Sequence, residues 1–234
     1  MICTGTRGTE TQDVRGRTRH GIVGAILATL MLTGQAGAQV VGCNWTEEAF
    51  WDGADLPAVE RCIAAGADIG ARDTHGGTPL HLAAGSGTVE TVQALIDAGA
   101  NIEARAGSGW TPLHRAAAFG TAEMVEALIA AGADIGVREG IFEFTPLHLA
   151  AAETVQALTA AGADIEARGT IDGWTPLHRA AAYDTAETVE ALIAAGADIR
   201  AQTEDGRLAV DLAEDNEAVR NHPVFWTLNE ARYD

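Results

Sequence analysis

Four histidines stand at one position of a recurring phrase, and they are the first candidates for chemistry. Each follows Thr-Pro-Leu, and they are His81, His114, His148 and His178. Imidazole is a common zinc ligand, so a ladder of histidines raises the question of a metal site. Packed helices lie about 8–10 Å apart, whereas a zinc–nitrogen bond is about 2 Å long. Histidines of two repeats therefore cannot share one ion, and the spacing predicts no metal site.

Nucleophiles for covalent catalysis are scarce. The only serines, Ser86 and Ser108, lie in glycine-flanked turns, and neither forms the G-x-S-x-G elbow of hydrolases. The chain contains no lysine, which excludes Schiff-base chemistry. Its acidic residues are spread along the repeats without a pair suited to acid–base catalysis, and no phosphate-binding or dinucleotide-binding fingerprint appears. The sequence predicts a chain that is not an enzyme and uses no cofactor.

The phrase that carries the histidines defines the architecture. Thr-Pro-Leu-His begins at Thr78, Thr111, Thr145 and Thr175, with spacings of 33, 34 and 30 residues, and an eroded copy places Leu208 33 residues after Thr175. A second phrase, Gly-Ala-Asp/Asn-Ile, recurs in step with the first. It begins at Gly66, Gly99, Gly132, Gly162 and Gly196. Two phrases that share one period indicate a repeat protein.

Each repeat predicts two helices and a projecting turn. Thr-Pro favours a helix start, because threonine caps the helix and proline is tolerated at its first position. A short inner helix is expected from Thr111 to Phe119, and Gly120-Thr121 should end it and start a second helix. Apolar residues then recur at helical spacing. A left-handed Gly132 is expected to stop this second helix.

These phrases resemble the hallmark of the ankyrin repeat family, matched here as GWTPLHRAA and GADI over roughly Asp52 to Asp215. The resemblance implies an all-α repeat solenoid of about four core repeats with N- and C-terminal caps. It further implies antiparallel helix pairs stacked into a curved solenoid, with β-hairpin-like loops on one edge. In this family the repeated histidine is structural and holds neighbouring loops by hydrogen bonds. The family pattern also implies that the chain binds another protein.

The central repeat departs from the pattern. From Thr145 to Ile165 it is four residues shorter than the copy from Thr111 to Ile135, and the missing piece corresponds to residues 119–122. This piece contains the turn between the two helices. We therefore expect the helices of this repeat to be shortened or joined tightly.

The first 38 residues resemble a secretory signal peptide. Arginines at 15, 17 and 19 precede an apolar run from Ile22 to Leu32, and Ala36-Gly37-Ala38 offers a cleavage site before Gln39. The eleven-residue run is short of the roughly 20 residues that span a membrane. We expect a periplasmic or secreted chain. The expected segments are 1–38 as leader, 39–77 as arm and capping repeat, 78–207 as ankyrin repeats and 208–234 as C-terminal cap.

Cleavage would leave a strongly acidic chain with two cysteines. Residues 39–234 contain 11 arginines and 31 acidic residues, a formal net charge of −20. Such a surface disfavours nucleic acid and anionic membranes and attracts a basic partner. In an oxidising compartment Cys43 and Cys62 are expected to form a disulfide. The alternatives are two free thiols, or a lipid anchor on Cys43, because Val40 to Cys43 faintly resembles a lipobox.

Positions that the repeat does not need for its own packing are the candidate partner-binding residues. The residue before the repeated threonine is aromatic in three neighbouring copies, and other aromatic residues and arginines follow at or near the inner helices. Such residue types are enriched at interface hot spots. The candidates are Trp110, Arg115, Phe119, Phe142, Phe144, Trp174, Arg179 and Tyr183. The alternative is that the indole rings only pack on adjacent hairpins.

The sequence thus predicts a monomer that binds another protein, possibly a basic one, through the concave face of the solenoid. Two alternatives remain open. One is a secreted effector that engages host proteins, and the other is a structural module of the cell envelope without a dedicated ligand. Residues at the two ends of the chain, including Trp51 and Val59 before the first full repeat and Val224 to Leu228 after the last, are expected to cap the core.

Overall fold

The computed structural model describes residues 43–51, 54–170 and 172–233, and every regular element in these ranges is a helix, apart from one isolated bridge between Gln202 and Leu208. The predicted all-α repeat solenoid is confirmed. The inner helices are α3 (Pro79–Ser86), α5 (Pro112–Phe119), η1 (Pro146–Leu149), α8 (Pro176–Tyr183) and α10 (Ala209–Ala213). The outer helices are α2 (Leu56–Ala64), α4 (Val89–Asp97), α6 (Ala122–Ala130), α7 (Ala152–Ala160) and α9 (Ala186–Ala194).

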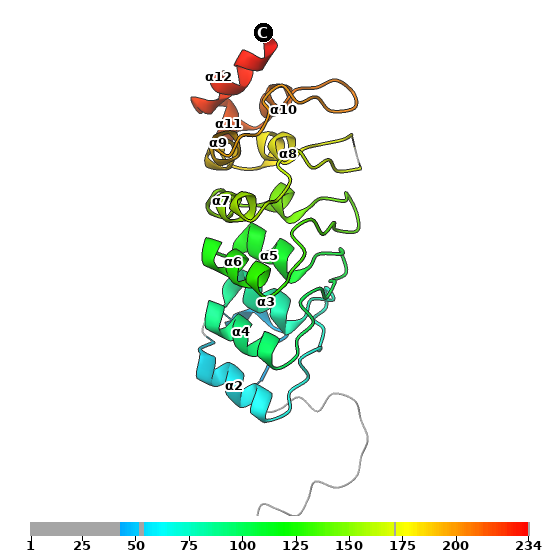
Figure 1. Ribbon diagram of the computed structural model, residues 1–234, viewed down its shortest axis with the longest axis vertical. Coiled ribbons are helices and arrows are strands. Elements are labelled where there is room, and N and C mark those ends of the chain that lie inside the picture. Colours follow the sequence, from blue (N-terminus) through cyan, green and yellow to red (C-terminus); the bar gives the residue numbers. More distant parts are fainter. Residues whose placement is uncertain (1–42, 52–53, 171, 234) are drawn as a thin grey trace, which may run out of the picture. The chain divides into compact units, whose positions relative to one another are not determined.

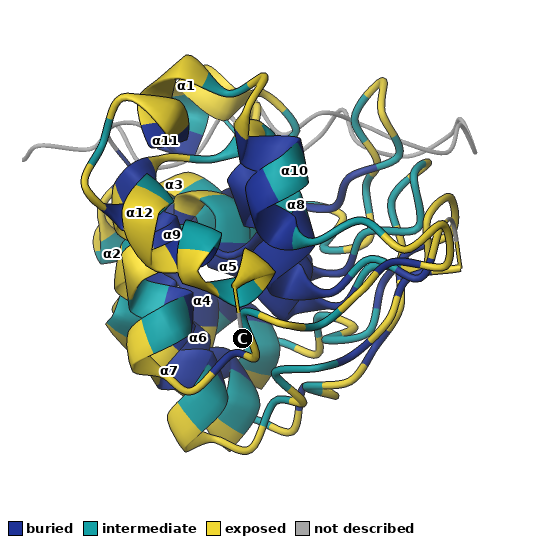
Figure 2. Ribbon diagram, turned by 90° about the horizontal axis from the view of Figure 1, so that it is seen from above, coloured by how far each residue is buried: buried dark blue, intermediate teal, exposed yellow. Residues whose placement is uncertain are grey.

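The inner and outer helices form two layers, and the connecting loops project from the side of the inner layer (Figure 1). Buried residues concentrate in the inner helices and where the two layers meet (Figure 2). The leucine of each Thr-Pro-Leu-His phrase is at most 1% exposed, for example Leu113 and Leu147. Leu128 of α6 and Leu158 of α7, in the outer layer, belong to the same core cluster and are fully buried. Each such side chain contributes about 1.5–3 kcal/mol through its burial.

Local chemistry starts and stops these helices as the sequence predicts. Thr111 is the N-cap of α5, with Pro112 at the first helical position. Thr121 caps α6, where its hydroxyl accepts a hydrogen bond from the Met124 N–H. Gly132 ends that repeat's second helix with a φ of 101°, a left-handed conformation that favours glycine.

A ladder of arginines ties the projecting loops together, and the sequence reasoning missed it. In each rung the arginine Nη1 donates to a backbone carbonyl of its own loop. It also donates to the backbone carbonyl of the residue at the same position in the next loop, which is an arginine in the first three rungs. Arg105 Nη1 lies 2.8 Å from the Arg138 carbonyl oxygen, and Arg138 Nη1 lies 2.7 Å from that of Arg168. The first and last rungs are made by Arg72 and Arg168. Four of the 11 arginines after residue 38 are thus structural.

The central repeat accommodates its deletion in the inner layer. Its outer helix α7 keeps nine residues, but its inner helix is reduced to the single 3-10 turn η1 of four residues. Ala150 and Ala151 then continue in extended conformation. The deletion removes the capping threonine, so α7 begins after Ala151 without a side-chain cap, and the Ala151 N–H donates to the Ala117 carbonyl of α5 over 2.9 Å. The expected shortening is therefore confirmed for the inner helix, whereas the outer helix keeps its full length.

Both ends of the stack are covered. At the N-terminal end α1 (Glu48–Trp51) contacts α3, and Trp51 and Val59 are buried. At the other end α11 (Glu217–Arg220), α12 (Val224–Asn229) and η2 (Glu230–Arg232) follow α10. Val224 and Leu228 pack into the core as predicted. Trp226 does not: it is 68% exposed, because it lies on the opposite side of α12.

Cys43 and Cys62 are joined by a disulfide whose Cα atoms lie 5.7 Å apart. The bond ties the start of the described chain to α2, where Cys62 is buried. The predicted leader, residues 1–38, lies outside the described residues. Among the helices that the structure describes, none has the length and apolar character to cross a bilayer.

Candidate partner-binding face

The repeated histidines position the candidate residues. In each repeat the Thr backbone N–H donates to the histidine Nδ1, at 3.2 Å for Thr111 and His114. That nitrogen therefore carries no proton, and Nε2 donates to the loop carbonyl of the next repeat. The accepting residues are Trp110, Phe144, Trp174 and Arg207, at 2.9, 3.1, 3.0 and 3.3 Å. The structural role implied by the family pattern is confirmed, and the histidines fix the backbone from which the candidate side chains project.

The same contacts keep these histidines neutral. Burial lowers the pKa of all four, to about 4 for His114 and His148, and the hydrogen bond to the carbonyl only partly opposes this effect. A neutral ring is required, because the Thr N–H needs an unprotonated Nδ1 as its acceptor. With both ring nitrogens occupied, the ladder supports the fold rather than a chemical step.

Two stacked aromatic pairs flank the central repeat on the inner-helix side. Trp110 stacks on Phe119 at the end of α5, with ring centroids 6.2 Å apart, and Trp174 stacks on Tyr183 at the end of α8, at 5.8 Å. In each pair the helix-end ring is the exposed member, because Phe119 is 61% and Tyr183 72% exposed. Both tryptophans are half-buried, although they stand at positions that the repeat does not need for its own packing. Packing on neighbours thus accounts for part of their area.

The loop between these pairs carries further aromatic residues. The ring of Phe144 lies parallel to His148, with centroids 4.7 Å apart, and contacts Phe142 at 5.4 Å. It also packs on Gly169 of the next loop, where any Cβ would lie 2.6 Å from the ring. Phe142 is 43% and Ile141 58% exposed. Phe144 is therefore mainly a packing residue, while Phe142 presents apolar surface to solvent.

Both candidate arginines are already neutralised within the chain. Arg115 forms an ion pair with Glu48 of α1, and its guanidinium lies 5.3 Å from the centre of the Phe119 ring. Arg179 pairs with Asp184 at 2.5 Å, and both side chains are 21% exposed. Burial raises the pKa of Asp184, although its pair with Arg179 opposes this shift. Neither arginine is therefore a free cation on this face.

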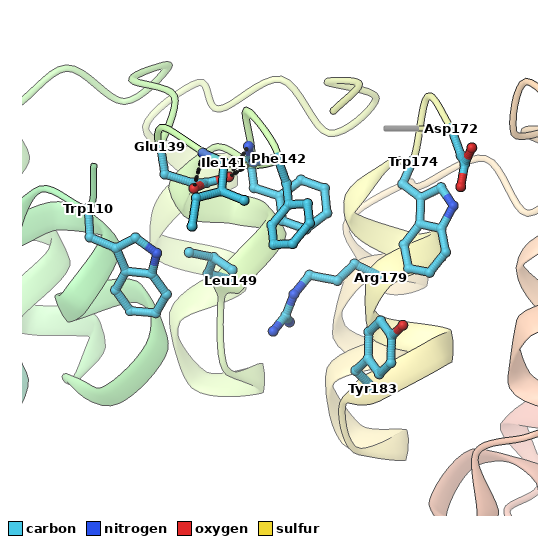
Figure 3. A pocket seen from close by; sticks show the side chains of 10 residues that line it. Trp110, Glu139, Ile141, Phe142, Leu149, Asp172, Trp174, Arg179 and Tyr183 are labelled. Carbon is cyan, nitrogen blue, oxygen red and sulfur yellow. Dashed lines mark hydrogen bonds between the residues drawn. The ribbon is translucent and has the colours of Figure 1, made fainter. Parts of the chain in front are cut away.

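An open cavity of about 500 Å³ lies over the shortened helix η1, lined by Trp110 of the first aromatic pair and by Trp174 and Tyr183 of the second. We call it the notch. Trp110 and Trp174 stand on opposite sides, and Arg179 extends from α8 into the space between them (Figure 3). Leu149 of η1 also lines it, with Ile141 and Phe142 on the loop side. A second cavity lies beside the first loops, and Trp110, Arg115 and Phe119 form part of its wall.

Most predicted residues meet at the notch, and the exceptions have physical reasons. Trp110, Phe142, Phe144, Trp174, Arg179 and Tyr183 line it. Arg115 and Phe119 face the second cavity instead. Sequence reasoning missed Ile141, Leu149, Glu139 and Asp172. The signal for Leu149 was available, because it occupies the position of Arg115 and Arg179 in the copy that carries the deletion.

Glu139 shapes the loop that borders the notch. It is 4% exposed, and its carboxylate accepts hydrogen bonds from the backbone N–H groups of Ile141, Phe142 and Phe144. A buried carboxylate that is bonded to several backbone donors stabilises one conformation of a loop. Glu139 therefore holds Ile141 and Phe142 in place beside the cavity.

Helix pairs in series, a histidine ladder and an open aromatic face define this chain as a helical repeat protein of the binding type. A family model described as ankyrin repeats (3 copies) matches residues 48–139 and 136–203. The chain belongs to the ankyrin repeat family, whose members are protein-interaction modules and are generally not enzymes.

Solved structures agree with this assignment. One similar chain comes from the complex of the predatory endopeptidase Bd0816 of Bdellovibrio bacteriovorus with the immunity protein Bd3460. It is 26% identical, with a TM-score of 0.62, and the match covers 78% of the present chain and 96% of that chain. A comparison with curated proteins found no match.

Proposed function

We propose that this chain is an exported, non-enzymatic binding protein that holds a partner protein on its inner-helix face, the concave side in the family pattern. The observation that carries the proposal is the distribution of exposed apolar side chains. Six large hydrophobic residues of the described chain are exposed, and four of them lie on this face or its loops. They are Phe119, Ile141, Phe142 and Tyr183. Exposed apolar patches on soluble proteins mark interaction sites.

Charge and the leader support the rest of the proposal. The net charge of −20 on residues 39–234 favours a basic partner by long-range attraction, which weakens as salt rises. The leader-like segment before Gln39 supports export to the periplasm or beyond. The disulfide supports the same compartment, because such bonds persist in oxidising environments.

Site-specific photo-crosslinking tests this function. A benzophenone amino acid is placed at Phe119 or Tyr183, and a control is placed at Glu126, which is exposed on the outer helix α6. We expect a crosslinked protein from the first two positions in the envelope fraction and none from the control. Crosslinks from Glu126 alone contradict the proposal. A partner found only after exposure to host cells favours an effector, and no crosslink at any position favours a structural module.

A second candidate rests on the solved complex. The similar chain comes from an assembly of an endopeptidase with an immunity protein, and the match spans 96% of that chain. We infer that an endopeptidase is one reasonable partner for this chain. If the crosslinked protein is a peptidase, its activity with and without the purified chain distinguishes inhibition from capture alone.

A further inference from the structure

The notch is a consequence of the four-residue deletion. In the two neighbouring repeats the inner helices α5 and α8 are eight residues long and end in an aromatic residue, Phe119 or Tyr183. In the central repeat η1 has four residues, and the position of that aromatic residue is missing. The inner layer is thus interrupted between two aromatic pairs, and Leu149 forms part of the wall.

The interior of the notch suits an apolar group. Seven of its ten lining residues are aliphatic or aromatic. The cavity has a volume of about 500 Å³, within the range of pockets that accept ligand groups. Water beside such a lining is displaced favourably by apolar side chains. The carboxylate of Glu139 faces the backbone donors of its own loop, so it does not make the interior a cation site.

The rim suits a cation. Asp172 lines the notch with a side chain that is 51% exposed, and its ion pair with Arg207 is long, at 3.9 Å. Glu143 is exposed in the loop that carries Ile141 and Phe142. Arg179, the one basic residue in the lining, is already paired with Asp184 and adds no free positive charge. A basic group next to an apolar anchor therefore finds complementary charge here.

We propose that the notch receives an aromatic or branched aliphatic side chain from a loop of a protein partner, with arginine or lysine beside it facing the acidic rim. The proposal rests on the proposed function, and it adds the position and the chemistry of the contact. A buried anchor in a water-excluding pocket is the usual form of an interface hot spot. The loop between α6 and η1, which carries Ile141 and Phe142, then covers one side of the anchor.

A repaired repeat tests the proposal. Inserting a copy of residues 119–122 between Ala152 and Glu153 restores the sequence pattern of the complete repeats. The restored inner helix should fill the notch, and it should keep or raise the melting temperature, because it adds a helical turn and a capping threonine. A random peptide library displayed on phage is panned on the purified exported chain. Selected peptides are then measured on both proteins.

We expect selected peptides to carry an apolar anchor next to arginine or lysine, and to bind the repaired chain about tenfold or more weakly, as expected for the loss of one anchor. Trp226→Ala, which removes an exposed tryptophan outside this face, is the matched control and should bind normally. Peptides that bind the repaired chain equally well overturn the proposal, as do acidic peptides that compete at the notch.

The two proposals fail differently. Some peptides could bind the repaired chain normally but bind Phe119→Ala, which alters the second cavity, more weakly. That result would refute the notch as the anchor site and would keep the inner-helix face as the binding surface. If the affinity of the peptides is the same for both variants as for the unmodified chain, and crosslinks form only from the outer helices, the proposed function is refuted as well. Circular dichroism of the repaired chain confirms that any loss of binding occurs in a folded protein.

Discussion

Acidification should unfold this protein through its buried histidines. The pKa of His114 and of His148 is about 4 in the folded chain, compared with 6.5 for an unperturbed histidine. Between these two values the unfolded chain binds more protons than the folded chain, so stability falls as the pH falls. At pH 5 the difference corresponds to about 2 kcal/mol for each of these rings, or about 4 kcal/mol together. His81 and His178 shift in the same direction.

One group opposes this trend. The raised pKa of Asp184 means that its folded form binds a proton more readily than its unfolded form, so acidification relatively favours the folded chain at that site. The described carboxylates with lowered pKa, such as Glu123, bind a proton less readily in the folded chain, so they add to the loss of stability as the pH falls toward and below 4.5. The net expectation between pH 7.5 and 5 is a loss of stability dominated by the histidines.

Urea unfolding followed by circular dichroism at pH 7.5 and pH 5 measures the effect. His114→Gln retains a donor and an acceptor but cannot be protonated, so it should reduce the pH-dependent loss by about 2 kcal/mol. His75→Gln, in an exposed turn, is the matched control for replacing a histidine outside the buried ladder. Equal pH dependence in the wild type and in His114→Gln would show that the buried histidines do not control acid stability.

Three further predictions concern stability and export. Cys62→Ser should lower the unfolding free energy by about 3 kcal/mol, because the disulfide to Cys43 closes a loop with a sequence separation of 19. Acyl chains found on Cys43 by mass spectrometry would contradict the disulfide. Arg138→Met removes hydrogen bonds to two loop carbonyls and should cost about 1–3 kcal/mol and speed amide exchange in those loops, and unchanged exchange would argue against the ladder. N-terminal sequencing of envelope protein should find Gln39 or a blocked end, whereas an intact leader on cytoplasmic protein argues against export.

The repeat architecture was readable from the sequence because its signals are local. Thr-Pro fixes a helix start, Gly132 fixes a left-handed stop, and the leucines between them recur at helical spacing. Each repeat uses the same short-range chemistry, so the pattern repeats with the structure. The length difference at Thr145 likewise predicted that the helices of that repeat are shortened or joined tightly, although only the inner helix is shortened and α7 keeps its nine residues.

Contacts between repeats were decided only by the tertiary structure. The pairs Trp110–Phe119 and Trp174–Tyr183 each stack a loop residue on the end of a helix. The sequence alone does not show that the two rings of a pair cover part of each other's surface. The same holds for Arg138, which resembles a surface charge in the sequence but bridges two loops. The notch has the same origin: the sequence records four missing residues, but a cavity forms because the neighbouring repeats keep their full inner helices on both sides of the gap.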